Sequence, residues 1–132
     1  MRDSRRRRTL VVDETTSYLW TVRHRHGDGV PCAEVLTLHR DGVRTRIVFR
    51  AGAGRYAGDG GPVGHSGAVG DREHHLNLHE PGVVRALVDE ALRRELLPYD
   101  GEVDGWDLLP GAALSRAAAA TAEAPPGCPP GP

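Results

Sequence analysis

Two histidines separated by one residue, His24 and His26, have the type and spacing that suit metal chemistry. Residues two apart in a β-strand point to the same side of the sheet, so the two imidazoles would share a face. The strand register that this sequence predicts places Glu34 opposite His24 on that face. Two imidazoles and a carboxylate match a ligand set for a divalent metal ion. The alternative is that both histidines lie partly in solvent at the end of a sheet, flanked by Arg23 and Arg25.

A second polar group, His75, Asn77 and His79, alternates with Leu76 and Leu78. If this stretch forms a strand, the leucines point into the core and the two histidines and the asparagine share the other side. This group adds imidazoles to the metal hypothesis.

Ser66 lies in Gly64-His65-Ser66-Gly67-Ala68, which spells most of the nucleophile elbow of serine hydrolases. An elbow needs a strand before the serine and a helix after it, to aim the hydroxyl. No strand pattern leads into Gly64, and no helix pattern follows Ala68. The glycines of residues 52–58 also miss the dinucleotide-binding spacing by one position. We therefore predict a flexible loop at residues 51–73 and assign neither a catalytic residue nor a cofactor.

All 17 basic residues are arginines, which excludes the chemistry of Schiff-base and P-loop lysines. The run of residues 5–8 could form a basic arm that binds nucleic acid, and five more arginines are expected to share one sheet face. These five are Arg23, Arg25, Arg44, Arg46 and Arg50. Against this hypothesis stand 18 acidic residues, a net charge of −1 and few aromatic residues for base stacking.

The elements that would position these residues begin with a hairpin. Asp41-Gly42 between two alternating runs favours a two-residue type I′ turn, because both turn positions need positive φ. This turn predicts that Leu36 pairs with Ile47 and Leu38 with Thr45. Apolar and polar residues then sort onto two faces. One face collects Leu36, Leu38, Val43, Ile47 and Phe49, and the other collects Val35, Thr37, His39, Arg44, Arg46, Val48 and Arg50.

The preceding strand extends the apolar face with Tyr18, Trp20 and Val22. If His26 opposes Cys32, then Trp20 faces Leu38, Val22 faces Leu36 and His24 faces Glu34. A short first strand over residues 10–12 would add Leu10 beside Trp20 and Val12 beside Tyr18.

Residues 81–96 have the apolar spacing of an amphipathic helix that begins at a proline. Packing the helix on the sheet buries the apolar side of both. Residues 103–109 are predicted as a last short strand, with Trp106 as a core anchor. The sequence thus predicts an α+β fold, an antiparallel β-meander of about four to six strands with one main α-helix packed on its apolar face.

The predicted domain organisation has three parts. Residues 1–8 form a disordered basic arm, residues 9–111 a single α+β domain, and residues 112–132 a disordered tail rich in Ala, Pro and Gly. No stretch approaches the roughly 18 consecutive apolar residues of a membrane helix, and residues 10–12 are too short for an export signal. Cys32 and Cys128 are predicted as free thiols in a cytoplasmic protein.

Four phrases together resemble a family of short actinobacterial proteins with no assigned activity. They are Arg46-Ile-Val-Phe-Arg-Ala-Gly52, His65-Ser-Gly-Ala-Val-Gly70, Leu76-Asn-Leu-His-Glu-Pro-Gly-Val-Val-Arg-Ala-Leu87 and Val103-Asp-Gly-Trp-Asp-Leu-Leu109. The resemblance covers roughly residues 17–109. It implies a small cytoplasmic α+β protein and supplies no catalytic residue.

The leading functional hypothesis is a small non-enzymatic binding or accessory module with an unidentified protein partner. Loop 51–73 is its expected contact surface, because loops on a rigid scaffold often carry recognition. One alternative is a small metal-dependent enzyme that uses His24, His26 and Glu34. Another is a nucleic-acid-binding module that uses the basic arm and the arginine-rich sheet face.

Overall fold

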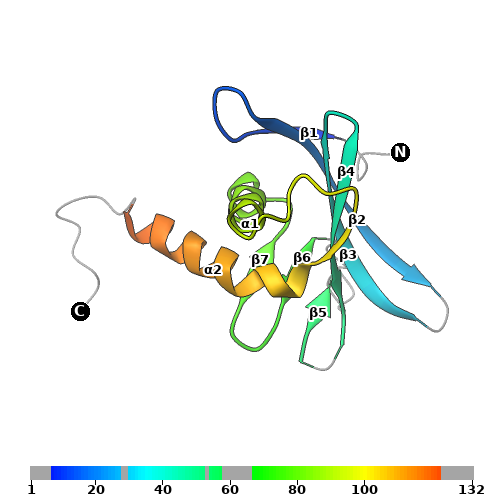
Figure 1. Cartoon of the computed structure of the whole chain (residues 1–132). Helices are drawn as coiled ribbons and strands as arrows, with labels where there is room; N and C mark the ends of the chain where they lie inside the picture. Colours follow the sequence, from blue (N-terminus) through cyan, green and yellow to red (C-terminus); the bar gives the residue numbers. More distant parts are fainter. Residues whose placement is uncertain (1–6, 28–29, 53, 58–66, 123–132) are drawn as a thin grey trace.

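The fold is built on a five-stranded sheet with the strand order β1-β2-β3-β4-β8 (Figure 1). The structure is a computed structural model of the chain and describes residues 7–27, 30–52, 54–57 and 67–122. The strands of this sheet are β1 (Arg8–Val11), β2 (Ser17–Gly27), β3 (Val30–Arg40), β4 (Val43–Arg50) and β8 (Gly101–Asp104). Neighbouring strands are antiparallel except β4 and β8, which are parallel.

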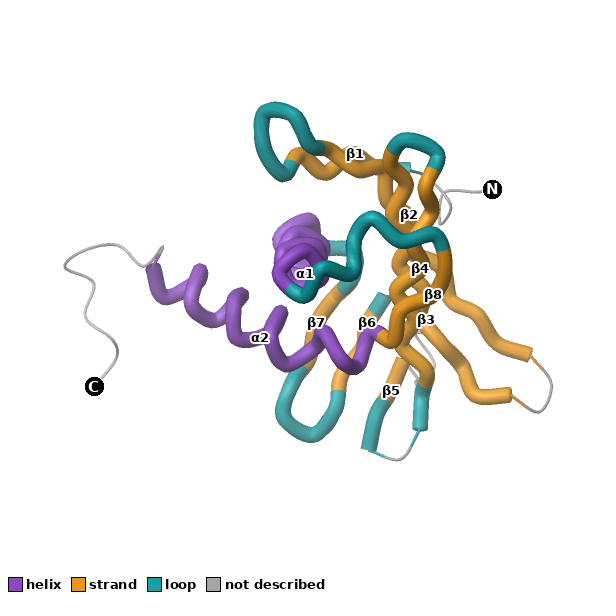
Figure 2. Tube along the Cα trace, viewed as in Figure 1, coloured by secondary structure: helices purple, strands orange, loops and turns teal. Residues whose placement is uncertain are grey.

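A smaller sheet and two helices complete the α+β fold. The smaller sheet contains β5 (Tyr56–Ala57), β6 (Ala68–Gly70) and β7 (His75–Asn77), and the helices are α1 (Pro81–Arg93) and α2 (Gly105–Ala122). Both helices lie on the same side of the five-stranded sheet (Figures 1 and 2). None of the helices in the described part of the chain is long and apolar enough to cross a membrane.

The predicted hairpin register is confirmed. Asp41 and Gly42 form the turn with φ of 53° and 79°, as a type I′ turn requires. Leu36 pairs with Ile47 and Leu38 pairs with Thr45. The local turn chemistry and the alternation of side chains therefore agree, and together they fix which residues face the helices.

The register of β2 with β3 agrees with the prediction over most of its length and differs at the end near the β2–β3 turn. Trp20 pairs with Leu38, and His24 pairs with Glu34, as expected. Between Arg25 and Gly27 the register shifts, because Arg25 pairs with Ala33 whereas Gly27 pairs with Val30. The expected pairing of His26 with Cys32 is therefore absent from the described register; Pro31, which has no N–H, lies in the irregular part of β3.

The predicted first strand forms, but two residues out of register. Leu10 pairs with Tyr18, and Arg8 rather than Leu10 lies opposite Trp20. The guanidinium of Arg8 stacks over the Trp20 ring, 4.6 Å from its centroid. A cation–π contact at the edge of the core thus takes the place of the apolar pair that was expected.

The hydrophobic core fills the space between the sheet and the two helices. The sheet contributes fully buried side chains such as Leu36, Ile47 and Phe49, and α1 contributes Val84 and Leu87. Val69 and Leu76 of the smaller sheet, and Leu78 directly after β7, belong to the same core. The segment that precedes α1 is therefore packed against the main sheet.

The strand predicted over residues 103–109 is wrong in its second half. The strand ends at Asp104, and α2 begins at Gly105. The Asp104 carboxylate accepts a hydrogen bond from the Trp106 backbone N–H at 3.0 Å, which is an N-cap interaction. Aspartate followed by an acidic first turn at Asp107 was the sequence signal for this helix.

Residues 112–122, which the sequence predicted to be the first part of a disordered tail, are helical. α2 continues to Ala122, and Ala112 is fully buried in the core. The fold therefore has two helices where the sequence predicted one main helix. Residues 123–132, and residues 1–6 of the predicted basic arm, lie outside the described residues.

Candidate functional site

His24 and Glu34 are brought together as the register predicts. They oppose each other on the core side of β2 and β3, and His24 Nδ1 lies 2.5 Å from Glu34 Oε2. Glu34 is fully buried, whereas the His24 side chain is 30% exposed. A carboxylate held against Nδ1 fixes the orientation of the imidazole ring.

The second oxygen of Glu34 binds a distant part of the chain. The Gly67 backbone N–H donates to Glu34 Oε1 at 2.8 Å. The Gly67 carbonyl in turn accepts from the Leu78 N–H at 2.8 Å. Burying a carboxylate is costly unless hydrogen bonds satisfy it. These contacts offset that cost and attach the smaller sheet to the end of β3.

Of the expected metal ligands, the structure brings together His24 and Glu34. The His24 and Glu34 atoms that face each other are already engaged, and the His26 side chain lies outside the described residues. No group of three His, Cys, Asp or Glu side chains suited to a metal lies within the part of the chain that the structure describes. A site that uses His26 stays a prediction.

The two histidines of the second group, His75 and His79, pack against different residues. Leu76 and Leu78 are buried as predicted, and β7 covers His75–Asn77. The His75 ring stacks on Tyr56 with centroids 5.8 Å apart, and its Nδ1 contacts the Tyr56 hydroxyl. The His79 ring instead lies against Gly67, where a Cβ would be 2.4 Å from His79 Cδ2. Both histidines therefore have packing roles.

Ser66, the serine of the elbow-like motif, lies outside the described residues. After the motif the chain enters β6 at Ala68, so a strand follows where an elbow requires a helix. This agrees with the sequence argument that residues 64–68 lack the context of a nucleophile elbow.

The opposite side of the main sheet carries the arginines. We call Arg23, Arg25, Arg44, Arg46 and Arg50 the arginine face, because strand alternation and register place them together on the side away from the helices. Glu102 and Asp104 of β8 join this side through the parallel pairing with β4. Five arginines and two carboxylates give it a formal charge of +3 (5 − 2), although the whole chain has −1.

One carboxylate on this face is shared among three arginines. Glu102 lies 3.1 Å from Arg50, 3.7 Å from Arg25 and 3.8 Å from Arg46. Such exposed ion pairs contribute little to stability. The Arg46 Nε is buried and has no hydrogen-bond partner within the described part of the protein. The five guanidinium groups of this face therefore outnumber the two carboxylates that β8 supplies to it.

A small apolar strip runs beneath the arginines. Ala33, Val35 and Val48 are buried although both helices lie on the other side of the sheet. Long arginine side chains flank this strip, since Arg23 pairs with Val35 and Arg46 lies two residues from Val48. A hollow of about 370 Å³ opens here, lined by Arg23, His24, Arg25, Val35, Thr37 and Arg46.

His39 lies within the positive field of this side. Burial lowers the pKa of the imidazole from its ordinary value of 6.5, and the nearby Arg7 and Arg44 lower it further. Each effect disfavours a second positive charge next to the guanidinium groups. His39 is therefore held in its neutral form over a wider pH range than a free histidine.

Comparison with protein families, curated proteins and solved structures finds no match for this chain. The resemblance to short actinobacterial proteins stays a prediction from the four sequence phrases.

Proposed function

We propose that this protein is a non-enzymatic binding module whose arginine face takes an acidic protein partner. The observation that carries the proposal is the concentration of five arginines on one side of the main sheet, where the strands place only two carboxylates. Guanidinium groups bind carboxylates through paired, charge-assisted hydrogen bonds, so an acidic surface complements this face.

An acidic protein suits the face better than nucleic acid does. No phenylalanine, tyrosine or tryptophan lies among the described residues of this side, so stacking platforms for bases are missing from it. The net charge of −1 adds no general attraction to phosphates.

The predicted contact loop, residues 51–73, is described only in part, because residues 53 and 58–66 lie outside the description. Its described arginines include Arg72, which is exposed. Reversing the charge of Arg72 and reversing charges on the arginine face therefore distinguishes a contact surface in the loop from one on the sheet.

The test is fluorescence anisotropy with two labelled probes of equal charge, a twelve-residue polyglutamate peptide and a DNA oligonucleotide, over a range of salt concentrations. The variant Arg23→Glu/Arg44→Glu reverses two exposed charges of the arginine face. The control Arg72→Glu/Arg116→Glu makes the same change in net charge elsewhere. We expect the peptide to bind wild type, the first variant to lose at least tenfold in affinity, and the control to lose less than twofold.

Tighter binding of the oligonucleotide than of the peptide at equal salt, lost in Arg23→Glu/Arg44→Glu, would assign the face to nucleic acid and overturn the proposed partner class. An equal loss in both double variants would show that net charge alone governs binding, against a defined arginine face. If only the control variant Arg72→Glu/Arg116→Glu lost binding, the contact surface would lie on the side of loop 51–73 and not on the arginine face.

A further inference from the structure

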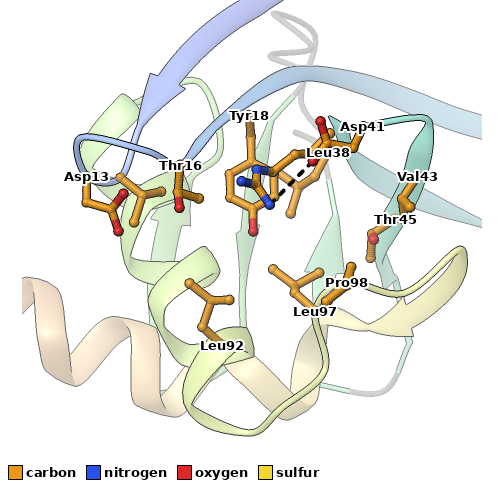
Figure 3. A pocket seen from close by; sticks show the side chains of 12 residues that line it. Asp13, Thr16, Tyr18, Leu38, Asp41, Val43, Thr45, Leu92, Leu97 and Pro98 are labelled. Atoms are coloured by element: carbon orange, nitrogen blue, oxygen red, sulfur yellow. Dashed lines mark ion pairs between the residues drawn. The ribbon is translucent and has the colours of Figure 1, made fainter.

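A cavity of about 380 Å³ lies on the helix side of the sheet, beside the turn between β3 and β4 (Figure 3). Its walls come from the connection between β1 and β2, from β2, β3 and β4, and from the end of α1 and the segment that follows it. The apolar part of the lining is Val12, Leu38, Val43, Leu92, Leu97 and Pro98. Its volume falls within the range of roughly 300–1,000 Å³ that is typical of small-molecule sites.

Tyr18 places a hydroxyl group in this cavity. The residue is only 7% exposed, and it lines the cavity together with the apolar side chains named above. Figure 3 shows the hydroxyl directed toward the space beside Leu92 and Leu97. Burial raises the pKa of the phenol, so the group remains a hydrogen-bond donor at physiological pH. A hydroxyl that faces an apolar cavity can donate a hydrogen bond to an oxygen of a bound molecule.

The charged groups at the rim are occupied by one another and by the backbone. Arg40 lies 3.7 Å from the Asp41 carboxylate and donates to the Thr15 carbonyl at 3.3 Å. Asp13 accepts from the Thr15 N–H at 2.9 Å. One arginine and two aspartates give the rim a formal charge of −1 (1 − 2), which disfavours an anionic ligand.

We propose that this cavity binds a small uncharged molecule with an apolar body and one oxygen that accepts a hydrogen bond from Tyr18. A short-chain alcohol, ketone or ester has this chemistry. The volume corresponds to about a dozen water molecules, which sets the size of the ligand. The cavity opens on the helix side of the sheet, so its ligand and the partner proposed for the arginine face occupy different surfaces.

The test uses three probes that differ only in their polar end: 1-hexanol, hexanoate and hexylammonium. Binding is followed by amide chemical-shift changes in NMR at millimolar concentrations. We expect saturable shifts with hexanol around residues 16–18, 38–45 and 92–98. Hexanoate and hexylammonium should bind at least tenfold more weakly, because the apolar wall desolvates their charge.

Two variants locate the binding. Tyr18→Phe keeps the ring and removes the hydroxyl, and it should weaken hexanol binding about fivefold, the typical effect of one hydrogen bond. Val43→Trp should fill the mouth of the cavity and abolish the shifts. The control Tyr56→Phe removes an exposed phenol from the smaller sheet and should leave the affinity unchanged.

Unchanged hexanol affinity in Tyr18→Phe would overturn the role of the hydroxyl, and with it the proposed ligand class. Tighter binding of hexanoate than of hexanol would overturn the preference for an uncharged head. The absence of saturable shifts with all three probes would show that the cavity takes no ligand of this kind.

Discussion

Gly105 lies directly against the ring of Phe49, so close that a Cβ added to Gly105 would be 2.6 Å from Phe49 Cε2 and Cζ. Phe49 is fully buried, and its ring packs edge-on against Trp106 with centroids 5.3 Å apart. The Trp106 indole N–H donates to the Arg50 carbonyl at 2.8 Å. The first turn of α2 is thus fitted closely to the end of β4.

This contact predicts that Gly105→Ala destabilises the fold. The added methyl would overlap a buried ring that has no open space to enter, and such overpacking typically costs about 1–3 kcal/mol. Urea unfolding measures the change. Gly52→Ala is the matched control, because a Cβ there meets nothing within 4 Å. Equal stability of the two variants would contradict the close packing of α2 on Phe49.

Truncation after Gly111 should lower the melting temperature by more than about 4 °C, roughly 1 kcal/mol for a domain of this size. The truncation removes the fully buried Ala112 and leaves α2 with only residues 105–111. It also removes Arg116, which lies 3.9 Å from Glu80 beside the start of α1. Truncation after Ala122 is the control and should leave the melting temperature unchanged. Calorimetry compares the three chains.

Replacing His24 with alanine should destabilise the protein by about 1–2 kcal/mol, because Glu34 would remain buried with one of its partners removed. The neighbouring Arg23→Ala alters the other side of the same strand and should change stability by less than about 0.5 kcal/mol. Denaturant unfolding of both variants at pH 7 gives the comparison. A similar loss in each would show that the buried contact contributes nothing specific.

Protein purified without a histidine tag should hold no stoichiometric zinc, manganese or iron. The reason is that His24 Nδ1 and the two Glu34 oxygens already bind each other and the Gly67 N–H, so a metal at these atoms would have to replace existing contacts. Elemental analysis by mass spectrometry measures the content. A stoichiometric metal that disappears in His24→Ala/His26→Ala would instead favour the metal-dependent enzyme.

Acidification should weaken the fold through His39. Its pKa is lowered in the folded state, so below about pH 6.5 the unfolded chain binds more protons at this residue than the folded chain does. The stability that His39 contributes is therefore fully present above about pH 6.5. It is lost as the pH falls from there toward the lowered pKa of the folded state. Urea unfolding at pH 7.5 and 5.5 should show a smaller loss on acidification for His39→Gln than for wild type. An equal loss would contradict the lowered pKa.

The sequence by itself determined the central hairpin and the strand pairings that depend on it. Asp41-Gly42 specifies a turn through backbone conformation alone, and alternation of side chains tells the two faces apart. Once the register is known, the geometry of neighbouring strands places His24 opposite Glu34 and gathers the arginines on one face. These features depend on residues that are close in the chain or linked by one turn.

The tertiary structure decided the rest, because it depends on contacts between distant segments. Nothing local to Glu34 indicates that Gly67 will bind its carboxylate, or that the smaller sheet will bury it. β8 pairs in parallel with β4, although the smaller sheet and α1 lie between these two strands in the sequence. Ala112 lies in an alanine-rich segment with few large side chains of its own. It is buried because α1 and Phe49 supply the apolar surface against which the start of α2 packs.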